Sequence, residues 1–142
     1  MPSPRFVDAN ILLRYFTNDD PQKAGYARYL LERVERREEK VATSALVVFE
    51  TVFTLQRTYK VPKAQVREML TDVLTLAGML LPGKSLCLRA LDLYVEKNVS
   101  FTDAYNAVYM HSRTIAEIYS WDADFDKLPG VTRVIPDAGT AS

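Results

Sequence analysis

Cysteine and histidine are almost absent from this sequence of 142 residues, which contains one of each, Cys87 and His111. A single cysteine excludes an intramolecular disulfide framework and a zinc site built from thiolates, and it fits a reducing compartment. A single histidine excludes a mechanism in which two imidazoles act as acid and base. The chemistry of this protein must therefore depend on other side chains.

The chain also lacks an excess of either charge, because 18 Lys and Arg residues balance 18 Asp and Glu residues. This balance excludes recruitment of a partner by bulk positive charge, so any contact with nucleic acid needs a local patch. The longest apolar run, residues 45–53, contains Glu50 and is far shorter than the ~20 residues of a membrane span. The N-terminus shows no signal-peptide pattern. We therefore expect a cytoplasmic protein that does not contact a membrane.

Apolar residues make up 48% of the chain and charged residues 25%, which is typical of a soluble globular protein. The length predicts a single domain over residues 1–142, with a core from about 5 to 135 and a frayed C-terminal tail. Short apolar runs alternate with segments of helical periodicity. This alternation predicts an α/β fold with a central, mainly parallel sheet of four to five strands flanked by helices. We expect strands at 5–7, 40–42, 79–81, 118–121 and 132–135, and helices at 10–16, 21–37, 45–59, 66–77, 85–97 and from 100 onward.

Two acidic residues directly follow predicted strands. Asp8 comes after the strand at 5–7, and Asp122 comes after the strand at 118–121. In an open parallel sheet, ligands bind beyond the carboxyl ends of the strands, where these two carboxylates should lie. Each of them is also an ordinary residue for a turn between a strand and a helix.

Two further acids have stronger structural alternatives. Glu50 lies in a helix that is apolar on nearly every face, so we expect that helix to be buried all round. A buried carboxylate is costly unless it is paired or binds a metal, although Glu50 could also sit at a rim or pair with an arginine. Asp103 closes the segment Ser-Phe-Thr-Asp at residues 100–103, which has the form of a capping box. Capping with one carboxylate oxygen leaves the other free for a ligand.

Several neighbouring residues are weaker candidates. Asp124 fits a cap of a short helical turn or a further ligand, and Asn10 fits a cap or a residue that orients Asp8. Thr43 and Thr102 are small hydroxyl residues near two of the acids, a position more typical of caps. Candidates for contacts with phosphates are Arg14, Lys84, Arg89 and Arg113, and candidates for stacking on bases are Tyr15, Tyr105, Tyr109 and Phe125.

Four segments in this order resemble the PIN-domain family: Phe-Val-Asp-Ala-Asn at 6–10, Ser-Ala-Leu-Val-Val-Phe-Glu at 44–50, Ser-Phe-Thr-Asp-Ala at 100–104 and Ser-Trp-Asp-Ala-Asp-Phe at 120–125. They look especially like the VapC group, the ribonuclease toxins of type II toxin–antitoxin pairs. The resemblance covers residues 5–135 and implies a three-layer PIN fold. It also implies one acidic pocket containing Asp8, Glu50, Asp103 and Asp122, with Asp124 as a further metal ligand.

The family binds Mg²⁺ or Mn²⁺ in that pocket and cuts single-stranded or loop RNA. The resemblance therefore implies a Mg²⁺-dependent endoribonuclease, a cognate antitoxin of the VapB type and a homodimer. Exposed apolar side chains that the core does not use, such as Phe16, Tyr26 and Tyr29, could form the antitoxin groove or the dimer surface.

The chemistry of the residues agrees with this expectation. Neighbouring carboxylates raise one another's pKa values, and a hard divalent cation with oxygen ligands relieves that repulsion. Such an ion would activate a water molecule for hydrolysis of a phosphodiester. Two alternatives remain open at this point: a catalytically silent PIN-like module that binds or regulates another protein, and an unrelated phosphohydrolase with Asp8 as nucleophile.

Overall fold

Short parallel strands alternate with helices in a computed structural model that describes residues 3–137. The chain forms two compact units, residues 1–87 and 88–142. No helix among the described residues is long and apolar enough to cross a membrane. In chain order, the elements are β1 (Arg5–Phe6), α1 (Ala9–Phe16), α2 (Pro21–Glu35), β2 (Val41–Ala42), α3 (Ala45–Arg57), α4 (Lys63–Leu74), β3 (Met79–Leu80), α5 (Lys84–Glu96), α6 (Phe101–Ser112), β4 (Glu117–Tyr119), the 3₁₀ helix η1 (Ala123–Lys127) and β5 (Thr132–Val134).

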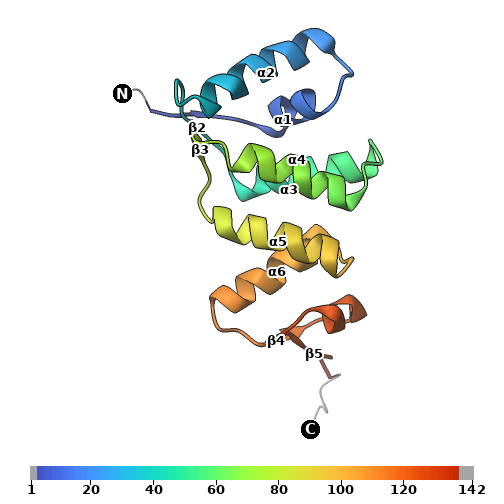
Figure 1. Ribbon diagram of the computed structural model, residues 1–142. Helices are drawn as coiled ribbons and strands as arrows, with labels where there is room; N and C mark the ends of the chain where they lie inside the picture. The colour runs from blue at the N-terminus through green and yellow to red at the C-terminus, as the bar shows by residue number, and fades with distance from the viewer. Residues whose placement is uncertain (1–2, 138–142) are drawn as a thin grey trace. The chain divides into compact units, whose positions relative to one another are not determined.

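The first unit contains a parallel three-stranded sheet in the order β1-β2-β3 (Figure 1). Arg5 pairs with Val41, which in turn pairs with Met79. The loops continue the ladder for one residue, because the Thr43 amide donates to the Leu80 carbonyl at 2.9 Å. Since the strands are parallel, the loop after β1, which holds Asp8, and the loop after β2 leave the same edge of the sheet.

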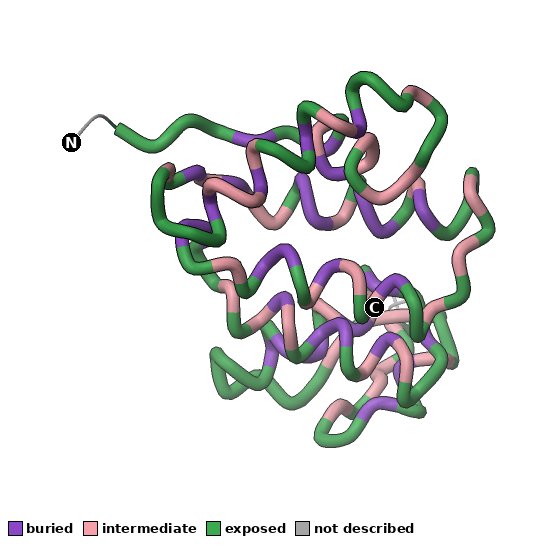
Figure 2. Tube along the Cα trace, turned by 45° about the horizontal axis from the view of Figure 1, so that its top comes forward, coloured by how far each residue is buried: buried purple, intermediate pink, exposed green. Residues whose placement is uncertain are grey.

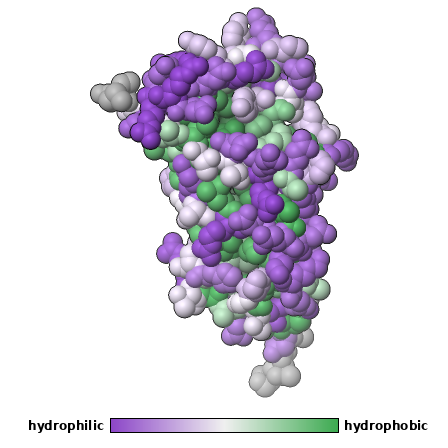
Figure 3. Space-filling view, in the orientation of Figure 1, coloured by the Kyte–Doolittle hydropathy of each residue, from purple (hydrophilic) through white to green (hydrophobic). Residues whose placement is uncertain are grey.

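Helix periodicity explains the core of this unit. In α2 the buried residues Ala24, Ala27, Leu31 and Val34 are three or four apart, and the other helices also bury one side, as the alternation of colours in Figure 2 shows. Hydrophilic side chains gather over the end of α2 and the turn that follows it (Figure 3), where residues 35–38 are exposed. The main cluster of buried side chains beside the sheet contains Val7, Ala9, Leu12, Leu31, Val34, Val41, Val47, Val73 and Met79.

The second unit contains the end of α5, α6, η1 and the parallel pair β4–β5, in which Ile118 is opposite Arg133. Phe101 at the start of α6 is buried, and its ring meets the edge of the Tyr94 ring with 5.9 Å between centroids. Phe125 within η1 is also buried and is only 4% exposed, so it anchors the segment that follows Asp122.

The predicted α/β class and the parallel pairing are confirmed, but the sheet differs from the expectation. The strands form one sheet of three and a separate pair, instead of one sheet of four to five. The first strand is also less buried than predicted, because Phe6 is 61% exposed and only Val7 beyond it enters the core. Strands of two or three residues have a recognisable apolar pattern but too few residues to indicate their pairing. A single domain over the whole chain stays a prediction, and the expected frayed tail at 139–142 lies outside the described residues.

Candidate acidic site

Asp103 lies in the first turn of α6, where the helix cap holds its backbone. Ser100 is the N-cap, and its Oγ accepts a hydrogen bond from the Asp103 amide at 3.0 Å. The predicted cap is therefore present on the Ser100 side, whereas capping of the Ser100 amide by the Asp103 carboxylate stays a prediction. The Asp103 side chain is half-buried. Burial raises the pKa of Asp103, and the neighbouring charge of Asp122 raises it further. The local fold thus holds a carboxylate where ionisation is unfavourable without a cation.

Asp122 and Asp124 lie on the segment that joins β4 to η1. The Asp122 amide donates to Ser120 Oγ at 2.9 Å, and the Asp122 carboxylate accepts from the Asp124 amide, also at 2.9 Å. Asp122 is the N-cap of η1, so one of its oxygens is used by the turn. Asp124 is 3.3 Å from the ammonium group of Lys127. These contacts fix both carboxylates in relation to the turn.

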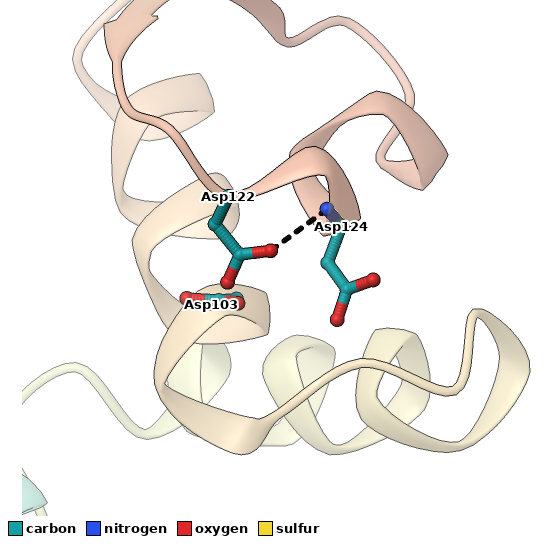
Figure 4. A group of neighbouring side chains, drawn as sticks. All are labelled: Asp103, Asp122 and Asp124. Atoms are coloured by element: carbon teal, nitrogen blue, oxygen red, sulfur yellow. Dashed lines mark hydrogen bonds between the residues drawn. The ribbon is translucent and has the colours of Figure 1, made fainter.

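The three carboxylates converge in the second unit. Asp103, Asp122 and Asp124 each offer one oxygen, and these oxygens all lie within 4.8 Å of one another. Figure 4 shows Asp122 directly above Asp103 at the start of α6, with Asp124 beside it on η1. A donor set made only of carboxylate oxygens suits a hard cation such as Mg²⁺ or Mn²⁺ better than zinc, which prefers nitrogen and sulfur. The arrangement can therefore hold a divalent ion.

Asp8 and Glu50 belong to the first unit. Asp8 is exposed and caps α1, and its carboxylate accepts from the Ile11 amide at 3.3 Å. Glu50 is exposed, so the prediction that its helix is buried all round is wrong. Leu46 is 78% exposed and Phe53 is 50% exposed on the same side of α3, which buries only the opposite side. The cost of burying a charge therefore gives no support to Glu50 as a ligand.

The candidates for orienting roles have different surroundings. Thr43 is buried, and its hydroxyl donates to the Val7 carbonyl at 2.9 Å, directly before Asp8. Such a residue can position the Asp8 backbone but cannot reach a substrate. Asn10 and Thr102 are exposed, and Arg14 is half-buried in the last turn of α1. Phe125 is buried, so the prediction that it stacks on RNA bases is wrong.

Sequence reasoning missed one contact that holds the acidic segment. His111 Nε2 lies 2.8 Å from the Pro129 carbonyl, which links the end of α6 to the turn after η1. Gly130 follows with a φ of 75°, and a Cβ placed there would lie 2.8 Å from His111 Nε2. The only histidine and a Pro-Gly turn were visible in the sequence, but nothing indicated that they meet.

The fold agrees with the comparison to known proteins. The chain belongs to the PIN domain family, whose profile matches residues 5–131. It is also similar to a curated protein from Aquifex aeolicus (strain VF5) named VapC ribonuclease, with 23% identity over 124 residues. The alignment covers 87% of this chain and 91% of that relative. The predicted resemblance to the family is confirmed.

Proposed function

We propose that this protein is a divalent-metal-dependent endoribonuclease of the VapC type. The observation that carries the proposal is the cluster of Asp103, Asp122 and Asp124, whose oxygens lie within 4.8 Å of one another in a chain of the PIN domain family. The similarity to a protein named VapC ribonuclease supports RNA as the substrate. On the resemblance to VapC proteins, we extend the proposal to a cytoplasmic homodimer inhibited by a VapB-type antitoxin.

Asp103 and Asp122 would hold the cation most directly, and Asp124 would bind it directly or through water. When bound, Mg²⁺ or Mn²⁺ would neutralise the carboxylates and activate a water molecule for attack on a phosphodiester. The Ser120 hydroxyl and the Asp124 amide hold Asp122 in place, so its oxygens need little reorganisation to bind. Hydrolysis would leave a 5′-phosphate and a 3′-hydroxyl, as the resemblance implies.

Asp8 and Glu50 enter the proposal on the family resemblance. The Ile11 amide binds the Asp8 carboxylate, and the buried Thr43 hydroxyl binds the preceding carbonyl of Val7. These two bonds hold Asp8 at the edge of the first sheet in a defined direction. Both Asp8 and Glu50 are exposed, so water and a phosphate group can reach them.

The proposal is tested by cleavage of single-stranded RNA with the purified protein in Mg²⁺, in Mn²⁺ and in EDTA. We expect cleavage with either metal and none in EDTA. Asp103→Asn should reduce kcat at least ~100-fold, since even residues that only support metal ligands contribute 10–100-fold. Asp126→Asn is the matched control, because Asp126 lies on the same 3₁₀ helix but pairs with Arg133 at 3.1 Å, outside the cluster. Equal activity of the wild type and the Asp103 variant would refute the proposal.

A further inference from the structure

A cavity of about 470 Å³ opens in the first unit between α1 and α2. Its size lies in the range of about 300–1,000 Å³ in which proteins bind small molecules. Asp8 lines this cavity at the start of α1, and Arg14 lines it at the other end of the same helix. The cavity therefore extends along α1 from one of the proposed catalytic acids.

Two cationic side chains face this cavity, Arg14 from α1 and Lys23 from α2. Among the described residues Arg14 forms no ion pair, and the ammonium group of Lys23 is 4.0 Å from Asp20, a distance at the limit of an ion pair. Exposed pairs of this kind contribute little energy, so both cations can bind an anion at small cost. Arg14 is suited to phosphate because its planar guanidinium donates two parallel hydrogen bonds.

The rest of the lining suits an unpaired base. Tyr26 is 67% exposed on α2, which leaves its ring accessible, and the cavity also contacts the apolar side chains of Ile11 and Leu30. Aromatic rings bind unstacked bases in single-stranded RNA, and such contacts tolerate any base. Asn10 adds an amide that can both donate and accept hydrogen bonds.

We propose that this cavity binds one unpaired nucleotide of the RNA beside Asp8. In this assignment Arg14 and Lys23 bind phosphate oxygens and Tyr26 stacks on the base. The assignment rests on the proposed function, because Asp8 connects the cavity to the reaction. A segment of a protein partner is the competing occupant, but the cations Arg14 and Lys23, of which only Lys23 has a weak ion pair, favour a polyanion with bases beside the exposed ring of Tyr26.

The test measures RNA binding separately from cleavage. A fluorescein-labelled single-stranded RNA of mixed sequence is titrated in EDTA, and its anisotropy gives Kd over a range of salt concentrations. Arg14→Gln and Lys23→Gln should each weaken binding by about 5–20-fold and reduce the slope of log K against log salt by about 0.7. Tyr26→Ala should weaken binding by about 5–150-fold, the loss expected for one stacked base, and should not change the salt slope.

Matched controls lie on the same helix. Arg28→Gln removes one exposed positive charge from α2, and Tyr29→Ala removes a ring that is 62% exposed, yet neither residue lines the cavity. Both controls should keep Kd within about twofold of the wild type, and circular dichroism should show that all five variants are folded.

The outcomes separate this assignment from the proposed function. If the wild type cuts RNA while the three cavity variants bind it as tightly as the wild type, the assignment is overturned and the cavity is left to a protein partner. Equal losses in the cavity variants and the controls would also overturn it, because they would show general charge attraction. Selective losses support the assignment, and because they are measured in EDTA they do so even if metal-dependent cleavage fails.

Discussion

Gly130→Ala is the substitution whose cost the structure defines most closely. The residue has a φ of 75°, and its added Cβ would lie 2.8 Å from His111 Nε2. A residue other than glycine in this left-handed region costs about 1–2 kcal/mol. The imidazole must also move, which breaks its bond to the Pro129 carbonyl and loses about 0.5–1.5 kcal/mol. The free energy of unfolding should therefore fall by about 2–3 kcal/mol.

A double-mutant cycle separates these two contributions. His111→Ala alone should cost about 1 kcal/mol, because it removes only the hydrogen bond. Once Gly130→Ala has displaced the imidazole, adding His111→Ala should cost almost nothing further. Urea unfolding in EDTA, followed by the fluorescence of the sole tryptophan, Trp121, reports on the unit that contains the contact. Two single costs that add to within about 0.3 kcal/mol would refute the reasoning, because independent sites behave in that way.

Two more predictions follow from raised pKa values. Burial and the charge of Asp122 raise the pKa of Asp103 in the folded protein. Ionised Asp103 therefore destabilises the metal-free fold at neutral pH. This penalty disappears as the pH falls below the pKa that Asp103 has in the unfolded chain. Asp103→Asn should therefore raise Tm in EDTA at pH 7 but not at pH 3.5. Mn²⁺ at ten times Kd should stabilise only the wild type, by about 1.4 kcal/mol. A lower Tm for the variant than for the wild type in EDTA at pH 7 would contradict this. Burial raises the pKa of Cys87 to about 11. Iodoacetamide at pH 8 should therefore label Cys87 about 100-fold more slowly in the native protein than in the urea-unfolded protein. Equal labelling rates, measured by mass spectrometry, would contradict this.

Local signals in the sequence predicted the helices well. The pair Asp20-Pro21 indicated a helix start, and α2 begins at Pro21 with the Asp20 carboxylate accepting from the Lys23 amide at 3.1 Å. The motif at 100–103 also indicated a helix start, and the Ser100 hydroxyl does accept from the Asp103 amide at 3.0 Å. Caps involve residues two or three apart, so short sequence motifs contain the whole interaction.

Burial and pairing were harder to predict because they depend on distant residues. The helix around Glu50 is apolar on nearly every face, so its sequence did not indicate which face is exposed. The pairing of the two- and three-residue strands likewise depends on where the helices pack. The bond from His111 to Pro129 spans 18 residues and involves a backbone carbonyl, a group that every residue possesses. No residue type could have revealed it.

The cluster of Asp103, Asp122 and Asp124 could be predicted only in part, because it depends on a sequence motif and on a tertiary contact. The alternation Asp-Ala-Asp at 122–124 was visible as a candidate, but its approach to the start of α6 depends on the buried anchor Phe125. The sequence predicted which acids to examine, and the structure brings three of them together in one unit. For Asp8 and Glu50 a shared role in the reaction stays a prediction.

The central claim is that these three carboxylates bind a divalent cation. Its most direct test is a titration with Mn²⁺ followed by electron paramagnetic resonance, in which bound Mn²⁺ loses the sharp signal of the aqueous ion. The wild type and Asp126→Asn should show the same saturable binding, and Asp122→Asn should weaken it at least ~10-fold. Binding that is unchanged in Asp122→Asn, or absent from the wild type at millimolar Mn²⁺, would contradict the claim.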